Sequence, residues 1–491
     1  MEEVDMTHEH NGEDARRART TGPATPLERD RLTGPSAPIN AERITGQATP
    51  LPADRPPPNT GVRLKRDGLL AEQLLEVAQS LPLGLFKIGE QPAALVSDPS
   101  LADELLLGRL APLKRSQREE ALSAVVSPLC FSPDAISERD QRRFGDALRH
   151  ASAPAKSWPV AEFVFEEATK RWAQGGAQSG EALSESCALL GAELSAALLF
   201  GAAEASEVAP RLLESFQLIE REGSALLFGD SSLVGRLFGG GKRKLKANIE
   251  ALELWMSRQI RARLGSDTQG EELLAHWVQV QDTHHRPISE QLVREELIAF
   301  SLIMGPLFAE KLCCAIDLIS GDEELGERLF KESASIDWAA PPVDGVEGSL
   351  PLAYGLWREA ERLCPSIWLI TRRVEEPLRI AGLRIEPNVE LVVSPLALQR
   401  DPRRRHQPDR CRPQRWLPGG EQDAIPESCA GQSVGQSRAL ALLFQERLGP
   451  LLIAYLAQRL RFKREEGSRE GKVEGGLWLR WTPHGATVSA R

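Results

Sequence analysis

Cysteine and histidine are scarce in this sequence, and neither forms a pattern that marks a common metal site. The 491 residues include seven cysteines and eight histidines. No two cysteines have the C-x-x-C spacing, and no histidine belongs to an H-E-x-x-H motif. The cysteine pattern argues against a disulfide framework or a structural zinc site, and it fits a reducing cytosol. The histidines give no metal signature.

The sequence also lacks an excess of positive charge and a long apolar run without charge. Its net charge of −10 predicts no dominant basic surface, which argues against a nucleic-acid-binding protein. No stretch of eighteen apolar residues is free of charged residues, and the N-terminus is acidic and polar, unlike a signal peptide. We therefore expect a soluble, cytoplasmic protein that does not contact a membrane.

Three copies of a twelve-residue motif follow one another near the N-terminus. They begin at Thr21, Thr33 and Thr45, and each carries Thr-Gly, a proline at its sixth position, an aliphatic residue and an acid–arginine pair. Because proline and glycine disfavour helix and regular sheet, residues 1–60 are predicted to form an extended, disordered arm. The arm is either a linker that grew by duplication or, over residues 21–56, a repeated docking peptide for a protein partner.

From about Gly61 the pattern changes to long helical stretches with a few short strands. Residues 83–98 read as two strands that join at a turn. The longest helical stretch, residues 289–320, is apolar on most faces, which predicts a central buried helix. Pro306 in its middle must remove a backbone hydrogen bond and bend it. The pattern as a whole predicts a mainly α protein with small β-sheets.

The C-terminal third contains further landmarks in a fixed order. A helix at 350–365 is followed by a predicted strand hairpin at 378–394 that turns at Pro387-Asn388, and a long final helix ends near Phe462. The last 25 residues are expected to make a small strand pair around 476–481.

Several short motifs within this third have the spacing of one known family. "REAERLCP" supplies E-x-x-R through Glu359 and Arg362, and Arg372 stands seven residues beyond its proline. "RDP" at 400–402 and "RPQRWLP" at 412–418, with Arg415, follow in order. This series resembles the haem-thiolate cytochrome P450 superfamily. The resemblance implies a cytochrome P450-like fold over residues 61–465, preceded by the arm and followed by a tail, residues 466–491.

The resemblance also assigns roles to basic residues. It implies that Glu359, Arg362 and Arg415 form a buried structural triad, and that Arg372 binds one haem propionate. Arg142 and Arg143 lie where the family carries a basic residue to the other propionate. The alternative for Glu359 and Arg362 is an ordinary pair on a helix surface.

The family's ligand loop, F-x-x-G-x-R-x-C-x-G, is degraded here. If Ser433 takes the cysteine position, Gly435 and Ala439 fall on the pattern. If Cys429 takes it, Gly431 is kept, but the phenylalanine, the first glycine, the arginine and the alanine are lost. We prefer the first register, because it leaves a final helix of familiar length.

The register decides the iron chemistry that the resemblance implies. A thiolate ligand donates the electron density that favours O–O cleavage, and a serine hydroxyl is not deprotonated enough to ligate iron strongly. Monooxygenation should therefore fail with Ser433 at the ligand position. Cys429 could serve only with a lowered pKa, and the charge of nearby Glu427 works against that.

The central helix has lost a second family motif. Where the family has A-G-x-[DE]-T-[TS], this chain, aligned on Gly305, has Leu307 at the position of the acid and Phe308 at that of the alcohol. Neither side chain can relay a proton. We interpret Met304, Leu307 and Phe308 as ordinary core residues, and we expect Phe308 to protrude towards the space that a haem or substrate would fill.

Three functions stay open. The first is a P450-like auxiliary without monooxygenase chemistry, similar in kind to the cysteine-less homologues that partner glycosyltransferases in bacterial antibiotic pathways. The second is an active haem-dependent monooxygenase with Cys429 as axial ligand, and the third is a haem-free catalyst in the vacated pocket. We prefer the first, because two catalytic elements are lost in one chain. It implies a partner such as a biosynthetic enzyme, and the degraded loop weighs against haem, the one cofactor implied.

Overall fold

The structure, a computed structural model, describes residues 56–64, 70–89, 91–106, 113–116, 120, 154–175, 180–228, 240–264, 272–281, 287–420 and 436–491. All of them belong to one compact unit, Leu51–Arg491. Three predictions lie outside the described residues and stay predictions: the repeated arm up to residue 55, the propionate role of Arg142 and Arg143, and the ligand loop with Cys429 and Ser433.

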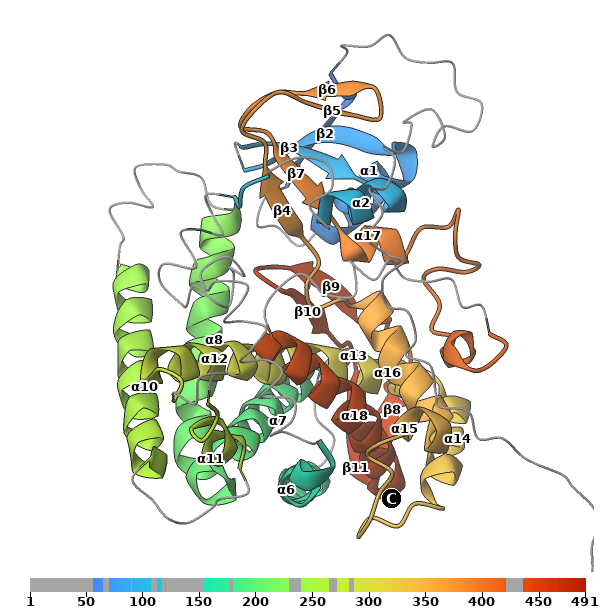
Figure 1. The fold of residues 1–491 in the computed structure, drawn as a ribbon. Helices are drawn as coiled ribbons and strands as arrows, with labels where there is room; N and C mark the ends of the chain where they lie inside the picture. The colour runs from blue at the N-terminus through green and yellow to red at the C-terminus, as the bar shows by residue number, and fades with distance from the viewer. Residues whose placement is uncertain are drawn as a thin grey trace, which may run out of the picture. The chain divides into compact units, whose positions relative to one another are not determined.

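The described chain is mainly helical with small sheets, as the sequence predicts (Figure 1). Its α-helices are α1 (Leu70–Ser80), α2 (Pro99–Leu106), α6 (Trp158–Gln174), α7 (Gly180–Phe200), α8 (Ala202–Phe228), α10 (Gly240–Leu264), α11 (Leu273–Trp277), α12 (Glu290–Leu302), α13 (Phe308–Ser320), α14 (Glu323–Ser333), α15 (Val346–Ser349), α16 (Pro351–Leu363), α17 (Pro395–Gln399) and α18 (Gln436–Arg459). Short 3₁₀ turns lie at η3 (Pro154–Ser157) and η5 (Pro413–Trp416).

Most strands are short, and the largest sheet has the order β1-β2-β3-β7-β4. Its strands are β1 (Asn59–Leu64), β2 (Leu83–Ile88), β3 (Gln91–Val96), β4 (Ile370–Arg373) and β7 (Glu390–Val393). The predicted strand pair at 83–98 is present as β2 and β3, which run antiparallel. Strand β7 joins the C-terminal third of the chain to this sheet, because it runs parallel to β3 with Ala93 opposite Glu390.

The predicted hairpin at 378–394 is only partly right. Strands β5 (Leu378–Ile380) and β6 (Leu383–Ile385) pair with each other and turn at Ala381 and Gly382, which both have positive φ. The expected turn at Pro387-Asn388 instead leads out of this hairpin into β7. All four residues of β7 are buried, so this strand takes a place inside the larger sheet.

The C-terminal segment forms two more strand pairs. Strand β9 (Lys472–Gly475) pairs with β10 (Leu479–Thr482), and β11 (Ala486–Ala490) pairs with β8 (Leu460–Arg464). The strand pair expected around 476–481 is therefore present, and its turn spans residues 476–478. Strand β11 also ties the tail to residues that directly follow α18.

The central helix is broken rather than merely bent. Helix α12 begins at the cap Ser289, whose hydroxyl accepts a hydrogen bond from the Leu292 N–H. A π-helical turn, η4 (Ile303–Leu307), surrounds Pro306 and separates α12 from α13. Proline has no N–H to donate to the preceding turn, and a π-turn accommodates the loss.

Two helical stretches are long and apolar enough to cross a membrane by composition alone, Ala182–Phe200 and Glu290–Ser320. Their apolar windows are 67% and 83% buried inside the protein. Core helices of a soluble protein have this character, so both stretches are consistent with the soluble protein that the sequence predicts.

Candidate functional site

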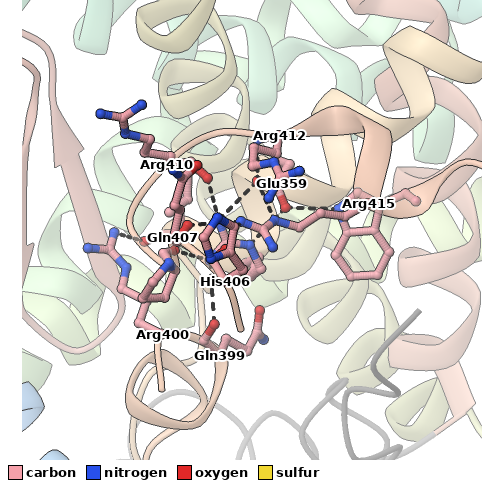
Figure 2. Close-up of polar contacts among 12 residues, drawn as sticks. Glu359, Gln399, Arg400, His406, Gln407, Arg410, Arg412 and Arg415 are labelled. Carbon is pink, nitrogen blue, oxygen red and sulfur yellow. Dashed lines mark hydrogen bonds and ion pairs between the residues drawn. The ribbon is translucent and has the colours of Figure 1, made fainter. Parts of the chain in front are cut away.

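A buried carboxylate, that of Glu359 on α16, forms the centre of a dense polar network (Figure 2). Arg362, one helical turn later, donates to it through Nε at 2.8 Å and Nη2 at 2.9 Å. The Nε atom of Arg415 in η5 lies 3.7 Å from Glu359 Oε2. The structure thus brings the three residues of the predicted triad together, and each side chain is at most 1% exposed.

Two further donors complete the surroundings of the carboxylate. The indole N–H of Trp416 donates to Glu359 Oε1 at 3.0 Å, and the backbone N–H of Arg412 donates to Oε2 at 2.7 Å. A buried carboxylate is costly unless cations and hydrogen-bond donors surround it. The four partners of Glu359 meet this requirement.

The two arginines hold the irregular segment between α17 and η5. Arg362 donates to the carbonyl oxygens of Pro408 and, at 3.0 Å, of Arg410. Arg415 donates to the carbonyls of His406 and Gln407 at 2.6 and 2.8 Å (Figure 2). The segment has little regular structure of its own, so these side chains fix its path.

The Arg-Asp-Pro motif fixes the start of the same segment. Arg400 donates to the Leu363 carbonyl at the end of α16. Asp401 accepts from the backbone N–H of Arg403 at 2.9 Å and from its guanidinium. Burial acts to raise the pKa of Asp401, but the hydrogen bonds from Arg403 outweigh it, and the pKa lies below its usual value.

The broken central helix packs against α16 and α18 where the sequence predicts a lost proton relay. Leu307 is half-buried, and its carbonyl accepts the Ser366 hydroxyl at 3.1 Å. The Gln445 amide of α18 donates to the Ile303 carbonyl at 2.6 Å. Two polar side chains therefore satisfy carbonyls at the break, as a distorted helix requires.

Phe308 is a core residue, as the sequence predicts, but its ring does not protrude into an open space. Its side chain is 0% exposed and packs against Trp357 of α16, with the ring centroids 5.1 Å apart. Lys311, one turn later, places its ammonium 4.5 Å from the centroid of the same indole. A side chain that lined an open space would keep accessible surface, so Phe308 is part of the core between α13 and α16.

The sequence interpretation missed one acid next to the break. The Glu310 carboxylate accepts the backbone N–H of Trp481 at 2.9 Å. Burial is the main reason that the pKa of Glu310 is raised to about 8, and Glu220 and Glu474 add to the rise. No local pattern could reveal this contact, because its partner lies 171 residues away in the chain.

Comparison with known proteins gives several similar chains. No protein-family model matches. Cyclooctatin synthase from Streptomyces melanosporofaciens is 23% identical over 407 residues, which is 82% of this chain and 88% of that protein. Pentalenene oxygenase from Streptomyces avermitilis is 23% identical over 54% of this chain and 58% of its own length. Human cytochrome P450 4V2 is 25% identical over 41% of this chain and 40% of its own length.

Solved structures agree on the architecture. The crystal structure of the cytochrome P450DA heme domain matches with a TM-score of 0.72 at 15% identity, over 89% of this chain and 97% of that one. A mutant of the same heme domain matches with the same score. These matches show that the chain has the cytochrome P450 fold, and the similar sequences support the cytochrome P450 superfamily.

The P450 resemblance implies a haem held through a cysteine thiolate and assigns one of its propionates to Arg372, which is a described residue. It lies on β4, its side chain is half-buried, and its Nη1 atom donates to the neighbouring Thr371 carbonyl at 2.8 Å. An arginine at such a place can form a charge-assisted bond with a carboxylate.

The sulfur donors among the described residues do not suit the P450 haem. The described cysteines are free thiols, four of them buried and Cys411 half-buried. Burial raises the pKa of four of them, Cys187, Cys314, Cys364 and Cys411, so they are neutral thiols at neutral pH. The described donor set therefore does not fit a haem-thiolate centre. A sulfur ligand could come only from the cysteines outside the described residues, Cys130 and Cys429.

Proposed function

We propose that this P450-fold protein has lost monooxygenase chemistry and acts as an auxiliary that binds a partner enzyme in a bacterial biosynthetic pathway. One observation carries the proposal. At the break of the central helix, where the superfamily places an acid and an alcohol, the chain has Leu307 and Phe308, and Phe308 is closed against Trp357. A hydrocarbon side chain inside the core cannot deliver protons.

The buried network around Glu359 supports the same proposal. Its contacts stabilise α16 and the segment that follows α17, and none of them requires a reaction. A chain that is kept for its surface would retain such a network while its catalytic motifs decay. The pathway context comes from the two Streptomyces relatives, whose names place them in cyclooctatin and pentalenene metabolism.

Oxygen consumption tests the loss of chemistry. The purified protein, supplied with a general ferredoxin and ferredoxin reductase, is expected to consume oxygen no faster than the redox proteins do alone. Consumption above this background that disappears in Cys429→Ala would contradict the proposal. Cys411→Ala provides the matched control, because this half-buried cysteine lies in the segment before η5.

A partner-binding role is tested with the arm. A deletion of residues 1–55 removes the three repeats but leaves β1, which begins at Asn59. We expect the full chain to co-purify one biosynthetic enzyme and the deletion to lose it. If the deletion retains the same enzyme at the same yield, the arm is not the recruiting element.

A second candidate, an active haem-dependent monooxygenase, is favoured by Arg372. An arginine on β4 that suits a propionate has an immediate use if haem is bound, and one relative is named an oxygenase. In this case Cys429 supplies the thiolate. A haem absorption band that is lost in Cys429→Ala but kept in Ser433→Ala supports this candidate, and the reverse result excludes it.

A further inference from the structure

The turn between β9 and β10 docks on one face of α8. The backbone N–H of Leu477 donates to Ser224 Oγ at 2.8 Å and to Glu220 Oε1 at 3.3 Å. The N–H of Trp478 donates to Glu220 Oε2 at 3.4 Å. The Ser224 hydroxyl in turn donates to Glu220 Oε1 at 2.7 Å. We call Glu220, Ser224 and the turn residues 476–478 the latch.

Two glycines make this close approach possible, one on each side of the contact. A Cβ atom on Gly476 would collide with the Glu220 carboxylate. A Cβ atom on Gly223 would lie 2.6 Å from the side chain of Leu477. At both positions the atoms that a Cβ would meet belong to side chains of the opposite segment, so each glycine leaves room for a side chain across the contact. Both the helix and the turn therefore carry a glycine at the place where they touch.

The same hairpin is tied to the break in the central helix. The N–H of Leu479 donates to the Ser366 carbonyl at 3.2 Å, and the Ser366 hydroxyl donates to the Leu307 carbonyl at 3.1 Å. Helix α8 also reaches the break directly, because a Cβ atom on Gly305 would collide with the ring of Phe216. Two contiguous routes therefore join α8 to η4.

The latch is held by polar contacts whose strength is limited. Burial raises the pKa of Glu220, while the hydrogen bonds from Ser224 and from the turn act to lower it. The cost of removing the carboxylate from water is therefore only partly offset while the turn is docked. When the turn leaves, the carboxylate regains its hydration, but Leu477 and Trp478, which pack on the apolar core, are withdrawn with it.

We propose that the latch couples the position of α8 to the conformation of the central-helix break, so that releasing the turn from Glu220 loosens η4 as well. The coupling runs through a continuous series of hydrogen bonds and packed side chains, which is the physical form that such a link requires. It concerns the fold itself and is independent of whether the protein binds haem or a partner.

Hydrogen exchange read out by mass spectrometry on the full chain tests the proposal. In Glu220→Ala, amide exchange is expected to rise at least about tenfold over residues 476–482, because a hydrogen-bonded carboxylate is lost. Exchange over residues 303–308 is expected to rise with it. The matched control is Glu214→Ala on the same helix, since this exposed carboxylate pairs only loosely with Lys244, at 3.4 Å. This control variant should leave amide exchange unchanged over both residues 476–482 and residues 303–308.

A milder variant tests the same coupling in case Glu220→Ala does not fold. Ser224→Ala removes one hydrogen bond and keeps the carboxylate, and a smaller rise over both segments is expected. Unchanged exchange over residues 476–482 in both variants would show that the turn is not held by these groups. Faster exchange there with no change over residues 303–308 would overturn the coupling.

Discussion

Glu359 shows how far a residue-scale prediction from the sequence can reach. Its E-x-x-R spacing and the later Arg415 suggest a triad, and the structure brings these side chains together with two more donors, Trp416 and the Arg412 N–H. These two could not be predicted, because their positions depend on the path of an irregular segment.

Removal of the Glu359 carboxylate should be severely destabilising. Glu359→Ala leaves two guanidinium groups buried without a counter-charge, so we expect a loss of about 3–5 kcal/mol in the free energy of unfolding. Urea denaturation followed by tryptophan fluorescence measures it. Glu386→Ala is the control, since its exposed pair with Arg384 at 2.9 Å should contribute less than about 1 kcal/mol. Equal losses of unfolding free energy in the two variants would favour the alternative, in which Glu359 and Arg362 are an ordinary pair on a helix surface.

The raised pKa of Glu310 predicts that the stability of the fold depends on pH. Its folded pKa, about 8, lies above the ordinary value of 4.5, so the folded protein binds the proton more tightly than the unfolded chain. The resulting stabilisation is fully present below pH 4.5 and is lost as the pH rises through 8. Between pH 7 and 9 we expect a loss on the order of 1 kcal/mol in unfolding free energy.

Glu310→Gln should flatten this profile, because the amide oxygen can still accept the Trp481 N–H but does not ionise. Urea denaturation at several pH values compares the two proteins. Asp317 and Glu220 also have pKa values raised by burial, so part of the slope is expected to persist. A variant with the same slope as the natural protein would assign the effect to those two acids instead.

At the scale of elements, the central helix was predicted in its extent and its weak point. Apolar periodicity placed the helix over residues 289–320, and Pro306 marked the break. The hairpin at 378–394 was harder, because a strand that is buried on both faces has no alternating pattern and gives no sign of its partner. The pairing of β7 with β3 joins segments almost 300 residues apart, and no local signal indicates it.

The packing of Phe308 between α13 and α16 can be tested by truncation. Phe308→Ala should reduce the unfolding free energy by about 3–5 kcal/mol, since a fully buried ring against Trp357 is removed. Leu307→Ala, at a half-buried neighbour, should cost less. Urea denaturation of both variants measures the two losses of unfolding free energy. A negligible effect of Phe308→Ala would mean that the ring faces an open pocket.

At the scale of the whole molecule, the family motifs predicted a mainly helical P450 fold, and the similarity to a solved P450 heme domain confirms this fold. The sequence could not show how the tail is held. Strand β11 pairs with β8 over five residues, and the acids Glu310 and Asp317 of α13 accept backbone N–H groups from Trp481 and Gly471. The contacts of the two acids join segments more than 150 residues apart.

Deletion of residues 466–491 should therefore prevent stable folding. It would expose the partners of β11 and leave the carboxylates of Glu310 and Asp317 without their backbone donors. We expect loss of most soluble protein, and no cooperative urea transition in what remains. Deletion of residues 1–55, by contrast, should leave the urea midpoint unchanged. A soluble, cooperatively unfolding tail deletion would contradict the structural role of the tail.

The central claim, that this P450 fold no longer supports oxygen activation by a thiolate-bound haem, is tested most directly by one spectrum. The full chain is expressed with ample haem precursor, reduced with dithionite and treated with carbon monoxide. We predict that the difference band that gives the superfamily its name is absent. A clear band of that kind, lost in Cys429→Ala, would contradict the claim.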